Sequence, residues 1–167
     1  MKINQDHLYH GAALTQIAEH PTFKAINEVS LNGVRSRCAF LVNTDIGLYL
    51  KYATKPKGPF KEFIFTFHTD HLDELQKLRA RPSKLFICLI CVSASHICCI
   101  TYESLLELIA ERKQKKGADE ETYTILVTMP AGKSFRIYMN EPGRKKVMIE
   151  ERIVPRDDFP DVLFQKP

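Results

Sequence analysis

An apolar run of eight residues, LFICLICV at residues 85–92, constrains the fold of this 167-residue chain more than any other segment. The run is too short for a transmembrane helix, which needs about 20 apolar residues. A strand that is apolar on both faces has to be covered by other elements on both faces. We therefore expect residues 85–92 to form a central strand packed between helices.

Helix and strand patterns alternate along the rest of the chain. Apolar residues recur at helical spacing over residues 6–19, from residue 70 to Pro82 and over residues 102–113, which predicts three helices. Strands are expected where β-forming residues lie between turn-forming ones, namely at residues 37–43, 46–53, 62–67, 96–101, 123–129 and 133–139, with a short strand at 146–151. Residues 23–27 are expected to add only a turn.

This order of elements predicts an α/β (α+β) protein in which a mixed β-sheet is flanked by helices. Two hairpins are expected, one around Thr44 and Asp45 and a C-terminal one around residues 130–132. We expect a single α/β domain over residues 1–153. Residues 154–167 contain three prolines and are expected to form an irregular C-terminal tail.

The polar start of the chain and its cysteines indicate a cytoplasmic protein without a membrane partner. The segment MKINQDHLYHG lacks the apolar core of a signal peptide. The chain has five cysteines, and an odd number favours reduced thiols. Cys88 and Cys91 are three positions apart in the apolar strand and should face opposite sides, so we predict no metal site and no cofactor.

The positive charge of the chain is concentrated in one segment. The formal net charge is +4, and residues 51–61 hold four lysines and no acid, so the other 156 residues carry 20 basic and 20 acidic side chains. Lysines interleaved with aromatic residues can contact phosphates and stack on a base. The predicted nucleic-acid-binding residues are Arg35, Arg37, Lys51, Lys55, Lys57, Phe60 and Lys61. Alternatively, the segment is a solubilising loop that protects a sheet edge.

Two other basic clusters are expected to be neutralised. The cluster KQKK at residues 113–116 and the cluster GRKK at residues 143–146 are each followed closely by acidic residues. This pattern is typical of a solvated connector or of a surface linked by ion pairs.

The order helix, hairpin, strand, helix, strand, hairpin over roughly residues 6–100 resembles the core of the PD-(D/E)xK nuclease superfamily. This restriction-endonuclease-like fold includes archaeal Holliday-junction resolvases. In that family an aspartate and an acidic-x-Lys pair on neighbouring strands bind a divalent metal, and the lysine helps to position or activate the attacking water. The segment GLYLKYATK at residues 47–55 looks like the third core strand of the family.

The resemblance assigns roles to particular residues. Lys51 would fall on the family's lysine, Tyr49 on its acidic position, and Asp45 would stand in for the aspartate. Asp45 and Lys51 are therefore the candidate catalytic residues. A tyrosine cannot act as the carboxylate, so the resemblance implies a degenerate relative that does not cleave. Alternatively, Asp45 is a turn former and Lys51 a solvated strand lysine.

The leading hypothesis is a non-catalytic accessory protein of bacterial type. It would bind DNA or RNA, or a partner that processes nucleic acid, through the lysine-rich strand and loop. One alternative is a protein-interaction or regulatory module without a nucleic-acid role, forming a homodimer through a sheet edge or the second hairpin. Another is a divalent-metal-dependent nuclease, which would use Mg²⁺ and need Glu19 or Glu62 close to Asp45 and Lys51.

Overall fold

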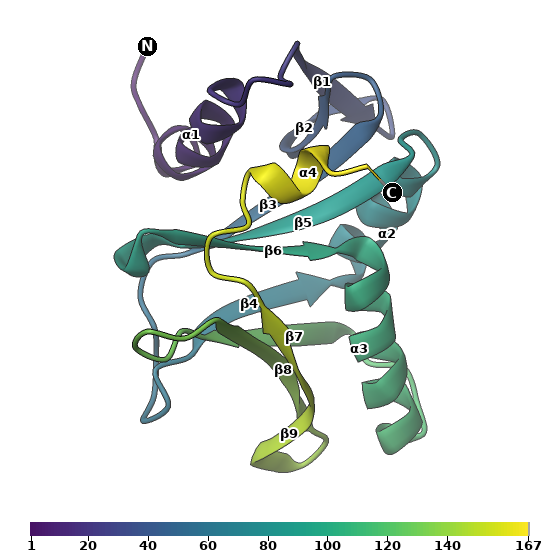
Figure 1. The fold of residues 1–167 in the computed structure, drawn as a ribbon. Helices are drawn as coiled ribbons and strands as arrows, with labels where there is room; N and C mark the ends of the chain where they lie inside the picture. Colours follow the sequence, from purple (N-terminus) through teal and green to yellow (C-terminus); the bar gives the residue numbers. More distant parts are fainter. Residues whose placement is uncertain (167) are drawn as a thin grey trace.

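The computed structural model describes residues 1–166, apart from the side chains of Lys145, Lys146 and Glu150 (Figure 1). Pro167, the last residue of the predicted tail, lies outside the described residues. Within the described part, no helix is long and apolar enough to cross a membrane. The helices are α1 (Gln5–Ala18), α2 (Thr69–Arg79), α3 (Tyr102–Lys116) and α4 (Asp161–Phe164), with a short 3₁₀ helix η1 (Val92–Ala94).

The strands form two sheets. The first has five strands in the order β1 (Ile26–Leu31), β2 (Val34–Val42), β3 (Ile46–Ala53), β5 (Lys84–Cys91) and β6 (His96–Thr101). Only β3 and β5 pair in parallel there, so this sheet is mixed, as predicted. The second sheet is antiparallel, in the order β4 (Phe63–His68), β7 (Thr122–Thr128), β8 (Phe135–Glu141) and β9 (Arg144–Val154).

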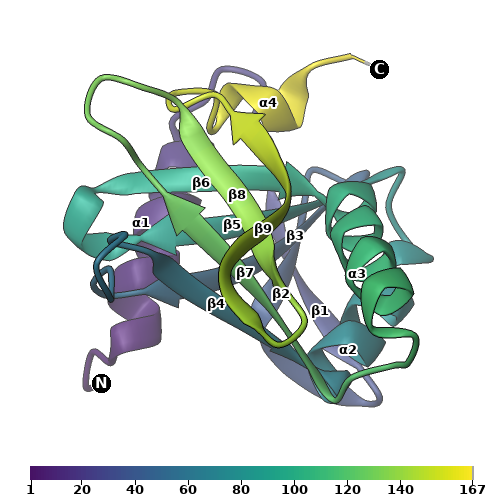
Figure 2. The ribbon, with the colours of Figure 1, turned by 90° about the horizontal axis from the view of Figure 1, so that it is seen from below.

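The central strand β5 of the first sheet is buried on both faces. Figure 1 shows α1 and α4 over one face and the second sheet under the other, with α3 at one end. Figure 2, seen from below, shows the strands of the second sheet crossing in front of those of the first. Phe86, Cys88 and Ile90 of β5 face the helices, and Ile87 and Leu89 face the second sheet. The predicted mixed sheet flanked by helices is therefore confirmed.

The prediction that residues 85–92 pack between helices is incomplete for one face, which the second sheet covers together with α2 and α3. The second sheet covers that face because its strands alternate apolar and polar residues. In β4, Phe63, Phe65 and Phe67 are buried, while Ile64 between them is 41% exposed. A strand with one apolar face covers a neighbouring layer with that face and leaves the other to water.

The expectation of only a turn at residues 23–27 is also wrong, because strand β1 begins at Ile26. It pairs with β2 across a turn in which Asn32 and Gly33 have φ of 55° and 75°. Asparagine followed by glycine suits a two-residue hairpin loop, since both residues tolerate the left-handed region. The dipeptide is the sequence signal from which this hairpin could have been predicted.

The segment after β9 returns to the first sheet. Leu163 of α4 is fully buried, and Phe159, Val162 and Phe164 pack against the same apolar cluster as α1. The nitrogen Nζ of Lys84 donates to the carbonyl oxygens of Leu163 and Gln165. The C-terminal segment thus completes the cover over β5.

The basic cluster at residues 113–116 is neutralised by ion pairs, as predicted. Lys113 pairs with Asp119 at 3.2 Å, Lys115 with Glu141 at 3.3 Å and Lys116 with Glu120 at 3.0 Å. In the other cluster, Arg144 lies 3.6 Å from Glu141, and the side chains of Lys145 and Lys146 are outside the described part.

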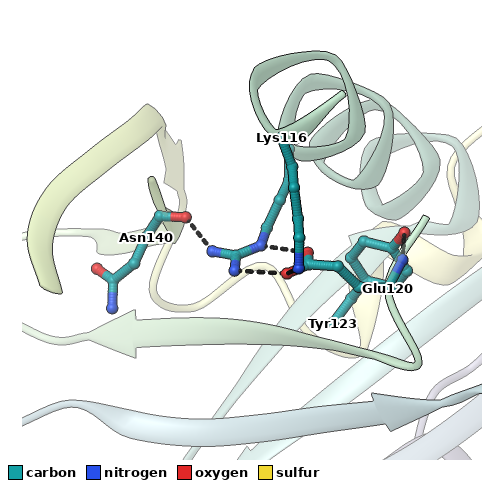
Figure 3. Close-up of polar contacts among 5 residues, drawn as sticks. Lys116, Glu120, Tyr123 and Asn140 are labelled. Atoms are coloured by element: carbon teal, nitrogen blue, oxygen red, sulfur yellow. Dashed lines mark hydrogen bonds and ion pairs between the residues drawn. The ribbon is translucent and has the colours of Figure 1, made fainter. Parts of the chain in front are cut away.

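Arg112 links α3 to the segment before β7 through Glu120 and to the second sheet through Asn140. Figure 3 shows these two partners. Nε and Nη2 of Arg112 donate to the two oxygens of Glu120 at 2.6 and 2.9 Å, and its Nη1 donates to the carbonyl oxygen of Asn140 on β8. The side chain of Glu120 is only 11% exposed. The hydrogen bonds from Arg112 lower the pKa of Glu120 to about 2.

We expect Glu120→Gln to lower the free energy of unfolding by about 2 kcal/mol at pH 7, because a bidentate, mostly buried ion pair is lost. The folded-state pKa lies below the unfolded value. The pair therefore stabilises the protein above about pH 4.5 and loses its effect as the pH falls toward 2. Chemical denaturation of both proteins at several pH values measures this difference.

Asp119→Asn is the matched control, because Asp119 is 84% exposed. It should leave stability nearly unchanged, since exposed pairs contribute little. A Glu120→Gln effect as small as that of the control, or one that does not shrink below pH 4.5, would contradict the role given to the Arg112–Glu120 pair.

Candidate nucleic-acid interface

Residues 54–62, here called the lysine hairpin, connect β3 to β4. The backbone N–H of Lys57 donates to the carbonyl of Glu62 at 2.8 Å, and the N–H of Glu62 donates back at 2.9 Å. Gly58 and Lys61 have φ of 73° and 50°, which lets the chain reverse between them. The predicted loop is therefore a turn closed by backbone hydrogen bonds.

The three lysines of this hairpin carry charge that the protein does not neutralise. Lys55, Lys57 and Lys61 are exposed, and none forms an ion pair within the described part of the chain. Phe60, in the turn between Lys57 and Lys61, is 48% exposed. The hairpin thus presents three positive charges around an aromatic ring.

Lys51 has a different environment from the hairpin lysines. It lies near the end of β3 and is half-buried, with its Nζ 5.0 Å from the ring centroid of Phe67 on β4. Burial lowers the pKa of Lys51, although Asp70 and Glu74 of α2 act in the opposite direction. Neither carboxylate forms an ion pair with it. Lys51 is therefore not a fully solvated strand lysine.

A recess of about 280 Å³ opens beside Lys51, between α1, the β2–β3 pair and α2. We call it the Lys51 recess, and its polar lining includes Arg37, Cys38, Tyr49, Lys51, Tyr52 and His71. The hydroxyl of Tyr49 donates to Oε2 of Glu74 at 2.9 Å. Burial raises the pKa values of Tyr49 and Cys38 and lowers that of His71, so all three are uncharged at neutral pH.

The two arginines predicted on β2 differ in their surroundings. Arg37 shares the recess with Lys51, and its backbone carbonyl lies 3.2 Å from Nδ1 of His10. Arg35 forms an ion pair with Glu28 at 2.8 Å. The structure thus places Arg37 beside Lys51. Arg35 does not line this recess, and its charge is paired with Glu28.

Asp45 lies at the opposite end of β3 from Lys51. Six positions separate them, which along a strand is about 20 Å. The carbonyl oxygen of Asp45 accepts the N–H groups of Ser83 and Lys84 at 3.0 and 3.2 Å, which anchors the turn before β3 to the start of β5. Asp45 therefore belongs to a turn, and it does not form a common site with Lys51.

The other acids considered for a metal centre are also held elsewhere. Glu62 accepts a hydrogen bond from the hydroxyl of Tyr138 on β8, and Glu19 is the C-terminal cap residue of α1. Among the described residues, no group of three or more histidine, cysteine, aspartate and glutamate side chains could hold a metal ion. The residues present therefore do not fit the Mg²⁺ that the nuclease alternative implies.

Sequence reasoning missed the contribution of α2 to this site. His71 and Glu74 are three positions apart in the segment HTDHLDEL, so they lie on one side of the helix. Leu75 and Leu78 are the buried residues of α2, and they lie on the adjoining side of the helix. This spacing is the signal that could have placed both polar side chains near β3.

Comparison with known proteins gives no relative. No protein-family model matches the chain, and no curated protein and no solved structure shows significant similarity to it.

We expect Tyr49→Phe to lower the free energy of unfolding by about 1–2 kcal/mol, because the half-buried carboxylate of Glu74 loses its hydrogen-bond donor. Urea denaturation at pH 7 measures the change. Tyr9→Phe is the control, since the Tyr9 ring packs in a tilted arrangement 4.8 Å from the ring of Tyr52 and Phe keeps that ring. Equal effects of the two substitutions would contradict a stabilising role for the Tyr49 hydroxyl.

Proposed function

We propose that the protein is a non-catalytic accessory protein that binds nucleic acid through the lysine hairpin. The observation that carries this proposal is the contrast between two basic segments. The lysines at 113, 115 and 116 are each paired with an acid, whereas Lys55, Lys57 and Lys61 are exposed and unpaired within the described part of the chain.

The chemistry of the hairpin favours a single-stranded ligand. Lysines that contact phosphates release the counterions condensed on the nucleic acid. This release gives affinity for nucleic acid without a preference for its sequence. An exposed aromatic ring adds stacking on a base, and stacking needs a base that is not enclosed in a duplex. Phe60 lies among the lysines and has half of its surface exposed. We therefore propose that single-stranded DNA or RNA binds more tightly than duplex.

A non-cleaving role fits the arrangement around Lys51. Asp45 is about 20 Å away along β3, and the position two residues before Lys51 is Tyr49, whose hydroxyl is bonded to Glu74.

The proposed relation to the PD-(D/E)xK core rests on the order of α1, the β2–β3 hairpin, β4, α2 and β5, although β4 belongs to the second sheet. All five cysteines are free, which fits the proposed cytoplasmic location.

The test is binding of a fluorescent 20-nucleotide strand, measured by anisotropy over a range of salt concentrations. The wild-type protein should bind with micromolar affinity at about 50 mM salt and lose affinity steeply as salt rises. The triple variant Lys55→Ala, Lys57→Ala, Lys61→Ala should bind about tenfold or more weakly. The slope of log affinity against log salt should fall by roughly 2, because three phosphate contacts are lost.

A second triple variant, Lys113→Ala, Lys115→Ala, Lys116→Ala, is the matched control. It removes the same net charge from lysines that are already paired, and its affinity should stay within about twofold of wild type. Equal loss in both variants would show that net charge alone is responsible. Absence of binding at about 50 mM salt would contradict the proposal and favour the protein-interaction alternative.

Phe60→Ala tests the stacking contribution separately. We expect the affinity for a single strand to fall about fivefold to thirtyfold, which corresponds to roughly 1–2 kcal/mol per stacked base. Affinity for a duplex should change little, and Phe60→Tyr should keep single-strand binding because it keeps the ring. A similar loss for both ligands would show that Phe60 supports the hairpin and does not contact a base.

A further inference from the structure

Lys51 has the surroundings of a reactive amine, in contrast to the lysines of the hairpin. Its side chain is half-buried and lines the Lys51 recess, and no carboxylate of the described residues forms an ion pair with it. A lysine in such a place gives up its proton more easily than one in water, and only the neutral amine is a nucleophile.

We infer that the Lys51 amine forms a reversible Schiff base with an aldehyde that enters the Lys51 recess. The inference rests on the proposed function for the origin of this aldehyde: the ring-opened sugar of an abasic site, in a strand held by the lysine hairpin. An abasic sugar has no base, so it is small enough for a recess of about 280 Å³.

The positions of the two sites support this assignment. Lys55 follows Lys51 by four positions, which is at most about 13 Å of extended chain. A strand on the hairpin therefore lies within reach of the recess. Arg37, which also lines the recess, adds a positive charge where the flanking phosphates of the abasic sugar would lie.

The chemistry needs no oxidant, reductant or metal. The nitrogen lone pair of Lys51 attacks the aldehyde carbon, a C–N bond forms, and the carbonyl oxygen takes up a proton to give a carbinolamine. The nitrogen then loses its second proton and the hydroxyl leaves as water, so aldehyde and amine become imine and water.

Nearby groups can move the protons of this reaction. His71 lines the same recess, and its lowered pKa leaves the imidazole neutral and able to accept the proton of the attacking amine. The hydroxyl of Tyr49 donates its only proton to Glu74, so its oxygen can accept a hydrogen bond from a group in the recess but cannot donate one. The remaining charged groups that face the site are Asp6 of α1 and Asp70 of α2.

The first arm of the experiment uses a fluorescent DNA strand with one abasic site and sodium borohydride, which reduces an imine to a stable amine. We expect a covalent protein–DNA adduct on a denaturing gel, mapped to Lys51 by peptide mass spectrometry. Lys51→Arg keeps the charge and should reduce the adduct about tenfold or more. Lys77→Arg, at an exposed lysine paired with Asp73, is the matched control and should react like wild type.

The second arm uses propanal and cyanoborohydride without nucleic acid, and it separates this inference from the proposed function. Preferential labelling of Lys51 by propanal supports a reactive amine even if intact DNA does not bind. Labelling by propanal without trapping of the abasic strand would assign the recess to a free small aldehyde and overturn the strand-borne one. Labelling spread evenly over the lysines, or equal trapping by Lys51→Arg, would overturn the inference, and circular dichroism checks that each variant folds.

Discussion

The fold depends on the burial of both faces of the parallel β3–β5 pair. Residues Ile46–Leu50 of β3 and Leu85–Cys91 of β5 are all buried. Two strands with no solvated face need a complete layer on either side. One layer consists of α1 and the C-terminal segment, and the other is the second sheet together with α2 and α3. Gly47 shows how close the packing is, since a Cβ there would lie 2.8 Å from Cγ of Pro82.

The candidate site lies where this buried pair ends. At the end of β3 the side chains change from fully to partly buried, at Lys51, Tyr52 and Ala53. A lysine at such a boundary keeps access to a recess while losing part of its hydration, and this loss of hydration lowers the pKa of Lys51. The chain then enters the lysine hairpin, so one strand end positions both the half-buried amine and the exposed charges.

The sequence allowed most individual elements to be predicted, and the failures have identifiable causes. Helix α2 and strand β5 follow from local apolar spacing and from Pro82, which lies between them. Strand β1 was missed although Asn32 and Gly33 signal its hairpin. The pairing of Asp45 with Lys51 failed because Asp45 lies in the turn before β3 and Lys51 lies near the other end of that strand. A resemblance in the order of elements says nothing about this distance. His71 and Glu74 lie at the site because α2 packs beside β3. The sequence patterns of the strands do not predict this packing.

The sequence by itself determined where most of the helices and strands lie and where the charge is concentrated, because both depend on residues close together in the chain. It placed all of the excess positive charge in residues 51–61. Only the tertiary structure decided that the strands form two sheets, that β3 pairs in parallel with β5, and that Lys51 is half-buried while Lys55, Lys57 and Lys61 are not. These features depend on contacts between segments far apart in the chain, and no local pattern specifies which apolar faces will meet.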